Sequence, residues 1–162
     1  MSTVTHPATL HASKAATWDV LDDFEGVHRW HFNVESSTLA SPNNEGPGAT
    51  RKVRMYDGTE VTEQIVEYDE GTSMKVAFVE HAMPLKRADV VFRLREVAED
   101  RTEVTIHMDY DMKYGPVGWL LDRAFLKPTM RKVFGRMVEG LERHVVSGDL
   151  IGKDGVPVAV AS

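Results

Sequence analysis

The segment MRKVFGRMVEGLERHVVS, residues 130–147, has the clearest periodicity in the chain. Its apolar residues recur at steps of three and four, which is the spacing that gathers side chains on one face of an α-helix. These residues are Met130, Val133, Phe134, Met137, Val138, Leu141 and Val145. We therefore predict a long amphipathic helix, with a kink or a restart at Pro128 and a cap at Gly148.

The chain before this helix changes to a period of two. Residues 86–97 and 102–114 alternate apolar and polar side chains, with apolar positions at Ala88, Val90, Phe92, Leu94, Val104, Ile106, Met108 and Tyr110. Such alternation predicts strands with one buried and one solvated face, as in antiparallel sheets. Further predicted strands, separated by turn-forming residues, span residues 34–39, 51–56, 61–68 and 72–81.

The N-terminal part adds one strand and two short helices. Residues 3–10 are β-prone but contain Pro7, which predicts an edge strand. Ser13 is expected to cap a first short helix, and residues 22–30 form a second. An apolar sheet face must be covered, and the C-terminal helix is long and apolar enough to cover it. The predicted fold class is α+β, a curved antiparallel β-sheet wrapped around a long C-terminal α-helix, with two short helices between strands 1 and 2.

The periodic pattern ends at Gly148, so we expect one domain over residues 1–148 and a flexible C-terminal tail over 149–162. The sequence has 162 residues, no cysteine and a formal net charge of −6. The acidic balance disfavours nonspecific nucleic-acid binding, and the apolar runs are too short for an integral membrane segment. A chain without cysteine and without a secretion signal fits a cytoplasmic protein. The number of subunits stays open.

Arg51 and Glu63 are the sharpest candidate site residues. Each alternates with apolar residues on its own strand, and buried charges are costly unless they are paired or used. A two-residue loop at Asp57-Gly58 would place Val53 and Glu63 on opposite faces. A three-residue or bulged turn that pairs residue 56 with residue 60 places them on the same face, and this turn agrees with both apolar patterns. The pair is interpreted either as a polar anchor for a ligand or as a structural ion pair.

Other conspicuous residues favour structural roles. His28 and His31 lie three residues apart, but no third ligand accompanies them, so we predict no metal site. Tyr110, Tyr114 and Trp119 are interpreted as core residues in preference to a ligand cage. His81 is either a loop residue or a residue at a cavity mouth. No nucleophile elbow, phosphate loop or dinucleotide motif is visible, so no catalytic residue is assigned and no cofactor is expected.

An ordered set of short motifs carries a family resemblance. The set consists of Trp30, Gly48-x-x-Arg51, Asp57-Gly58, Val61-x-Glu63-x-Ile65-x-x-x-Asp69 and Arg87-Ala88-Asp89. Over roughly residues 4–147 the chain resembles the START-like (SRPBCC) superfamily, which includes birch-pollen-allergen-like and polyketide cyclase/dehydrase-like proteins. The resemblance implies a helix-grip fold with a hydrophobic cavity. Where the family often has a tyrosine this chain has Ala88, which enlarges the expected cavity.

The inward faces of the predicted strands and helix supply the expected cavity lining. It consists of Arg51, Val53, Met55, Glu63, Ile65, Phe78, Ala88, Val90, Phe92, Met108, Tyr110, Phe134, Met137, Val138 and Leu141. The first functional hypothesis is a module that binds a small hydrophobic or amphipathic ligand, lipid or polyketide-like. The second is a polyketide cyclase/dehydratase-type enzyme in which Glu63, Arg51 or His81 transfers a proton. The third is a module that binds a protein partner through its outer surface, as co-chaperone relatives do.

Overall fold

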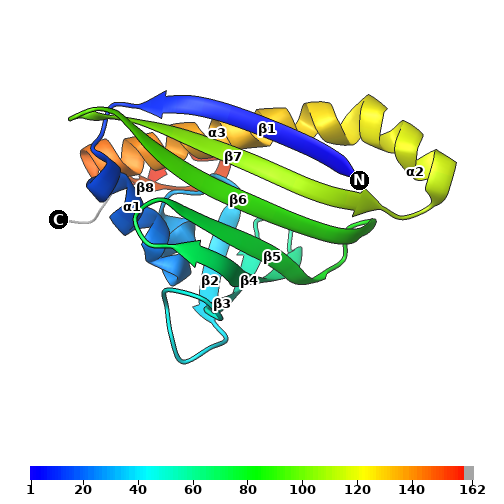
Figure 1. Ribbon diagram of the computed structural model, residues 1–162. Helices are drawn as coiled ribbons and strands as arrows, with labels where there is room; N and C mark the ends of the chain where they lie inside the picture. Colours follow the sequence, from blue (N-terminus) through cyan, green and yellow to red (C-terminus); the bar gives the residue numbers. More distant parts are fainter. Residues whose placement is uncertain (159–162) are drawn as a thin grey trace.

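The computed structural model of the protein describes residues 1–158 and is shown in Figure 1. In chain order its elements are β1 (Ser2–Leu10), α1 (Lys14–Asp22), the 3-10 helix η1 (Phe24–Arg29), β2 (Val34–Leu39), β3 (Thr50–Met55), β4 (Glu60–Asp69), β5 (Ser73–His81), β6 (Leu85–Ala98), β7 (Arg101–Met112), α2 (Gly115–Leu121), the π-helical turn η2 (Asp122–Leu126), α3 (Lys127–Ser147), β8 (Leu150–Ile151), the 3-10 turn η3 (Lys153–Gly155) and β9 (Pro157–Val158).

Strands β1 to β7 form one antiparallel sheet in the order β1-β7-β6-β5-β4-β3-β2. The sheet is not closed, because β1 and β2 remain its two edges. Pro7 lies on the edge strand β1, where its missing N–H removes no hydrogen bond from the sheet interior. The predicted α+β class is therefore confirmed, with α1 and η1 connecting β1 to β2.

Helix α3 lies along one face of the sheet, and α2 extends from the end of the molecule where β7 leaves the sheet (Figure 1). The residues predicted to face the sheet are buried: Phe134, Met137, Val138 and Leu141. Gly140 lies on the same face, and a Cβ there would collide with the carbonyl oxygen of Trp30. A side chain at this position would therefore push η1 away from α3.

The helix restarts next to Pro128, as expected. The helical segment continues from α2 through η2 into α3, which begins at Lys127 and has Pro128 in its first turn. A proline lacks the N–H that an interior helical residue donates. The π-helical turn η2, residues 122–126, ends two residues before Pro128. The C-terminal cap is as expected, because Gly148 adopts a left-handed conformation with φ of 73°.

Two expectations about individual segments are wrong. The aromatic residues Tyr114 and Trp119 are exposed rather than part of the core. The segment after Gly148 is also not a flexible tail over the described residues, because β8 pairs with β9 and Ile151 is only 2% exposed. Residues 159–162 of the predicted tail lie outside the described part of the chain.

Among residues 1–158, none of the helices combines the length and the apolar character that crossing a bilayer requires.

Candidate functional site

The β3–β4 hairpin places Arg51 and Glu63 opposite each other in the sheet. Its loop has three residues, Tyr56 to Gly58, and the backbone N–H of Met55 donates to the carbonyl oxygen of Thr59 over 2.8 Å. The expected loop length and the shared face are therefore right, but the loop lies one residue earlier than predicted. Gly58 explains the shift, because it adopts φ of +88° and a left-handed residue closes a three-residue hairpin loop at its last position.

Arg51 and Glu63 form a buried ion pair. Their residues are 7% and 8% exposed, and the Nε and Nη2 atoms of Arg51 each lie 2.6 Å from Oε2 of Glu63. The Nη1 atom donates to the carbonyl oxygen of Phe24 over 2.7 Å, and the guanidinium lies 3.8 Å from the centroid of the Phe24 ring. All three guanidinium nitrogens are thus engaged, which holds the positive charge in one position.

His31 is the third polar residue near this pair, and it is 9% exposed. Its Nδ1 atom accepts a hydrogen bond from the backbone N–H of Asn33 over 3.1 Å. Burial, followed by the positive charge of Arg51, lowers the pKa of His31 to about 3. The imidazole is therefore neutral near pH 7. Because Nδ1 accepts, the proton is on Nε2, which leaves that nitrogen as a donor.

The two histidines of the HRWH segment do not act together. Nδ1 of His28 lies 3.2 Å from the carbonyl oxygen of Glu25, and His28 does not line the cavity that His31 lines. Among the described residues, no group of three or more His, Asp or Glu side chains is arranged to hold a metal ion.

A cavity of about 310 Å³ lies between the sheet and α3. Nine of the residues expected to line it do so: Arg51, Val53, Met55, Glu63, Phe78, Val90, Phe92, Phe134 and Met137. The other six are buried in the core but do not border the cavity: Ile65, Ala88, Met108, Tyr110, Val138 and Leu141. Alternation along a strand identifies the inward face, but it does not say how far along that face the cavity extends.

The remaining lining residues were not predicted, and they fall into two groups. Some lie on periodic patterns that could have revealed them: Val61, Val76, Met130 and Val133. Others lie in η1, in loops or at element ends, where no period indicates a direction: Val27, Trp30, His31, Asn33, Val34, Asp57, Thr59 and Met83. His81 does not line the cavity; its ring packs edge-on against Phe78, with centroids 6.4 Å apart.

Solvent exposure distinguishes the two ends of the cavity. The lining residues that retain exposure are Asn33, Met55, Asp57, Thr59, Phe78, Met83, Met130 and Val133. They come from the η1–β2 loop, the β3–β4 hairpin, the second half of β5, the β5–β6 turn and the first turns of α3. The mouth therefore lies at this end, whereas the Arg51–Glu63 pair is buried at the inner end. The β5–β6 turn is next to the start of α2, since the N–H of Lys113 donates to the carbonyl oxygen of Pro84 over 3.0 Å.

Three solved structures illustrate what this fold resembles. A protein from Thermobifida fusca is 23% identical, with a TM-score of 0.72 over 90% of this chain and 93% of that one. The Zhui aromatase/cyclase from Streptomyces sp. R1128 is 16% identical, with a TM-score of 0.69 over 96% of this chain and 99% of that one. Truncated norcoclaurine synthase from Thalictrum flavum is 14% identical, with a TM-score of 0.70 over 90% and 94%. At these identities the likeness concerns the fold.

A comparison with curated protein sequences finds no match. The family model described as polyketide cyclase / dehydrase and lipid transport, in contrast, matches residues 1–146. This match covers every strand of the large sheet and nearly all of α3. The chain therefore belongs to the polyketide cyclase/dehydrase and lipid transport family of the SRPBCC superfamily.

Proposed function

We propose that the protein binds a small amphipathic molecule, with its apolar body in the cavity and an uncharged polar head at the inner end. The observation that carries this proposal is the buried Arg51–Glu63 pair bordering a cavity whose other walls are mostly apolar. Ligand pockets commonly combine an apolar lining with a few placed polar groups. The volume of about 310 Å³ is at the low end of the range for small-molecule pockets.

The polar end favours a head group that both donates and accepts a hydrogen bond. Both close nitrogens of Arg51 contact the same carboxylate oxygen of Glu63, so Oε1 remains able to accept from a ligand hydroxyl. Neutral His31 offers its Nε2–H to a ligand carbonyl or hydroxyl oxygen. A phenol, or a hydroxyl beside a ketone, matches these two groups.

The charge balance of the site disfavours an ionised head. Arg51 and Glu63 have opposite charges and compensate each other, and His31 is neutral. A ligand carboxylate or ammonium would therefore lose hydration without finding an unpaired counter-charge. This is the reason for proposing an uncharged head.

The test is titration with N-phenyl-1-naphthylamine, a neutral apolar fluorophore with one N–H donor. Glu63→Gln should weaken its binding, because an amide oxygen is a weaker acceptor than a carboxylate. Glu67→Gln, which changes an exposed residue on the same strand, is the matched control. Equal affinities for both variants would show that the Glu63 carboxylate does not anchor the probe. Native mass spectrometry of protein purified from its own host is a separate measurement, and it would identify the natural ligand.

A cyclase/dehydratase-type reaction is the second candidate, and the available Oε1 of Glu63 favours it. A carboxylate in an apolar cavity can remove a proton from a carbon next to a ketone, and the Nε2–H of His31 could stabilise the resulting enolate oxygen. In that case Glu63→Gln would abolish turnover of a polyketide-like substrate while binding survives. A binding module would show no turnover in either protein.

We keep a cytoplasmic location as part of this proposal, because a chain without cysteine needs no oxidising compartment to fold.

A further inference from the structure

The segment from Tyr114 to Phe125 exposes an unusual amount of apolar surface. Six large apolar side chains in these twelve residues are between 42% and 68% exposed: Tyr114, Val117, Trp119, Leu120, Leu121 and Phe125. The other seven exposed large apolar residues of the described chain lie outside this segment, and no stretch of twelve residues contains more than two of them. Soluble monomers rarely expose so many large apolar side chains within one short segment unless something binds them. We call this group the α2 patch.

The patch faces solvent because of how its helix is attached. Within α2 the buried residue is Gly118, and a Cβ at that position would collide with the carbonyl oxygen of Lys113. In η2 the buried residue is Asp122, whose carboxylate accepts hydrogen bonds from the hydroxyls of Tyr110 and Ser2. The inner side of the helix is therefore small and polar, and its apolar side is directed outward. This arrangement is the reverse of α3, whose apolar side is buried.

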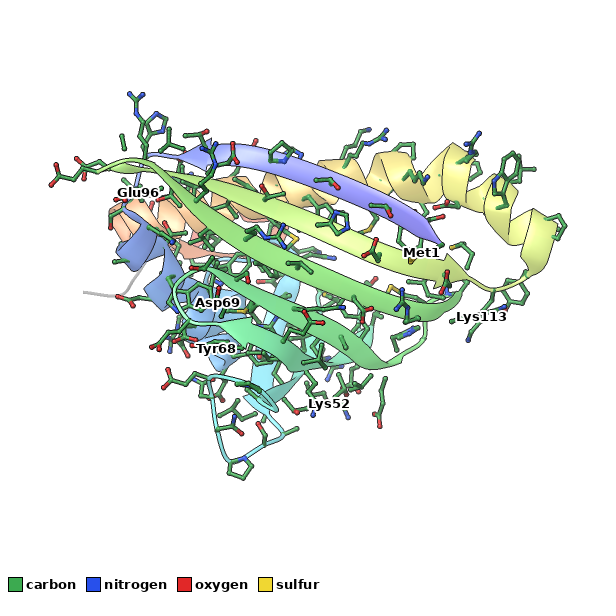
Figure 2. All side chains as sticks on the ribbon, viewed as in Figure 1. Met1, Lys52, Tyr68, Asp69, Glu96 and Lys113 are labelled. Carbon is green, nitrogen blue, oxygen red and sulfur yellow. The ribbon has the colours of Figure 1, made fainter. Side chains whose placement is uncertain are left out.

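Basic residues flank the α2 patch in the sequence and continue into α3. Residues 113–136 contain six Lys or Arg side chains and one acidic residue, the buried Asp122, in a chain whose net charge is −6. Arg123 lies over the Trp119 ring, 4.8 Å from its centroid. Figure 2 shows Lys113 at the α2 end of the molecule, whereas Asp69 and Glu96 lie at the opposite end. The segment that carries the apolar patch is thus rich in cations, although the chain as a whole is acidic.

We propose that the α2 patch docks the protein onto an anionic membrane surface. Aromatic and aliphatic side chains next to lysine and arginine are the composition of helices that lie in the interface of a bilayer. Anionic lipid headgroups complement the basic flanks, and this electrostatic attraction adds to the free energy gained by burying apolar side chains in the interface. A symmetric contact between two copies through the same patch would instead bring two sets of cations together.

Docking would direct the cavity mouth toward the lipid. Helix α3 follows η2 without a break, and its first turns carry Met130 and Val133 at the mouth. The β5–β6 turn, which contributes Met83, is hydrogen-bonded to Lys113 at the start of α2. An apolar ligand dissolved in a bilayer would then have a short route into the cavity. This route rests on the proposed ligand binding, whereas docking itself does not.

Flotation with lipid vesicles tests the docking. Wild-type protein should float with vesicles of phosphatidylcholine and phosphatidylserine, and much less with phosphatidylcholine alone. The double variant Leu120→Ser/Phe125→Ser should bind at least about tenfold more weakly, since two apolar anchors are lost. Val79→Ser/Val97→Ser, which changes two exposed apolar residues outside the patch, is the matched control and should bind as wild type does.

A second pair of variants tests the charges. Arg131→Glu/Lys132→Glu on α3 should weaken binding to the anionic vesicles about tenfold or more at low salt. Lys52→Glu/Arg54→Glu on β3 changes the net charge by the same amount away from the patch, and it should weaken vesicle binding less. Trp119 provides a spectroscopic signal, because Trp18 and Trp30 are buried. Its emission should shift to shorter wavelength on docking and should be quenched by brominated lipid.

The proposal is overturned if Leu120→Ser/Phe125→Ser floats as wild type does. It is also overturned if none of the proteins binds vesicles and wild-type protein instead forms a concentration-dependent dimer that the patch variants do not form. N-phenyl-1-naphthylamine binding should be unchanged in the patch variants, because none of the changed residues lines the cavity. A failure of docking is therefore distinguishable from a failure of the proposed ligand binding.

Discussion

Arg51 and Glu63 are paired across the β3–β4 ladder, and two nitrogens of Arg51 contact the same oxygen of Glu63 at 2.6 Å. The geometry is possible because the hairpin loop has three residues, which places both side chains on the inward face. A buried pair of this kind adds little net stability, but removing one partner leaves the other charge buried without compensation. Variants that lack one partner or both can therefore separate the cost of an unpaired buried charge from the contribution of the pair to ligand binding.

Replacing both members of the pair should restore stability that either single change removes. Arg51→Met or Glu63→Met alone leaves a buried charge without its partner and should lower the free energy of unfolding by about 3–5 kcal/mol. The double variant Arg51→Met/Glu63→Met should lie close to wild type, because apolar side chains of similar size suit a buried site. Urea denaturation of the four proteins measures this coupling, and strictly additive losses would contradict it.

His31 should make the protein less stable in mild acid. Its pKa is about 3 in the folded state and 6.5 without burial, so the unfolded chain takes up the proton first as the pH falls. The contribution of neutral His31 is complete above the unfolded pKa and is lost at up to about 1.4 kcal/mol per pH unit below it. Between about pH 6.5 and pH 5 this loss reaches about 2 kcal/mol.

Urea denaturation at these two pH values measures the loss in His31→Asn, whose side-chain oxygen can still accept from the N–H of Asn33. The variant should lack this part of the pH dependence, whereas His28→Asn should retain it. An unchanged slope in His31→Asn would place the titrating group elsewhere.

Two glycines of α3 should respond in opposite ways to the same substitution. Gly140→Ala introduces a methyl group that collides with the carbonyl oxygen of Trp30, so it should destabilise the protein and loosen η1. Gly135→Ala meets nothing nearer than 3.7 Å and should stabilise the helix by up to about 1 kcal/mol. The melting temperatures of the two variants measure these effects. A melting temperature raised in both variants, or lowered in both, would contradict the close contact of η1 with α3.

Phe134 should matter both for stability and for the size of the ligand. It is buried and it borders the cavity, so Phe134→Ala should cost about 3 kcal/mol, at the low end of the range for buried phenylalanines. The enlarged cavity should also accept fluorescent probes larger than N-phenyl-1-naphthylamine. Leu141→Ala, at a buried position away from the cavity, should lower stability without this second effect. Denaturation and probe titration together distinguish the two sites.

The local pattern of the sequence determined the elements and the way they are layered. The stripe from Phe134 to Leu141 identified the buried face of α3, and alternation identified the strands, because a period of 3.6 or 2 directly reflects which side of an element is covered. The shared face of Arg51 and Glu63 followed from the same rule. Only the position of the loop was shifted by one residue, since Gly58 rather than Thr59 ends it.

Only the tertiary structure decided where the cavity ends and which residues outside the periodic segments reach it. His31 follows a 3-10 helix, where no period indicates a direction, and the preceding residue, Trp30, lies close to Gly140 on α3. Tyr114 and Trp119 are large aromatic residues of the kind found in cores. They face solvent because Gly118 and Asp122, on the other side of the helical segment, are the residues that pack against the rest of the protein. The type of a side chain sets how much free energy its burial contributes, but the packing of segments that are distant in the sequence determines which face of an element is buried.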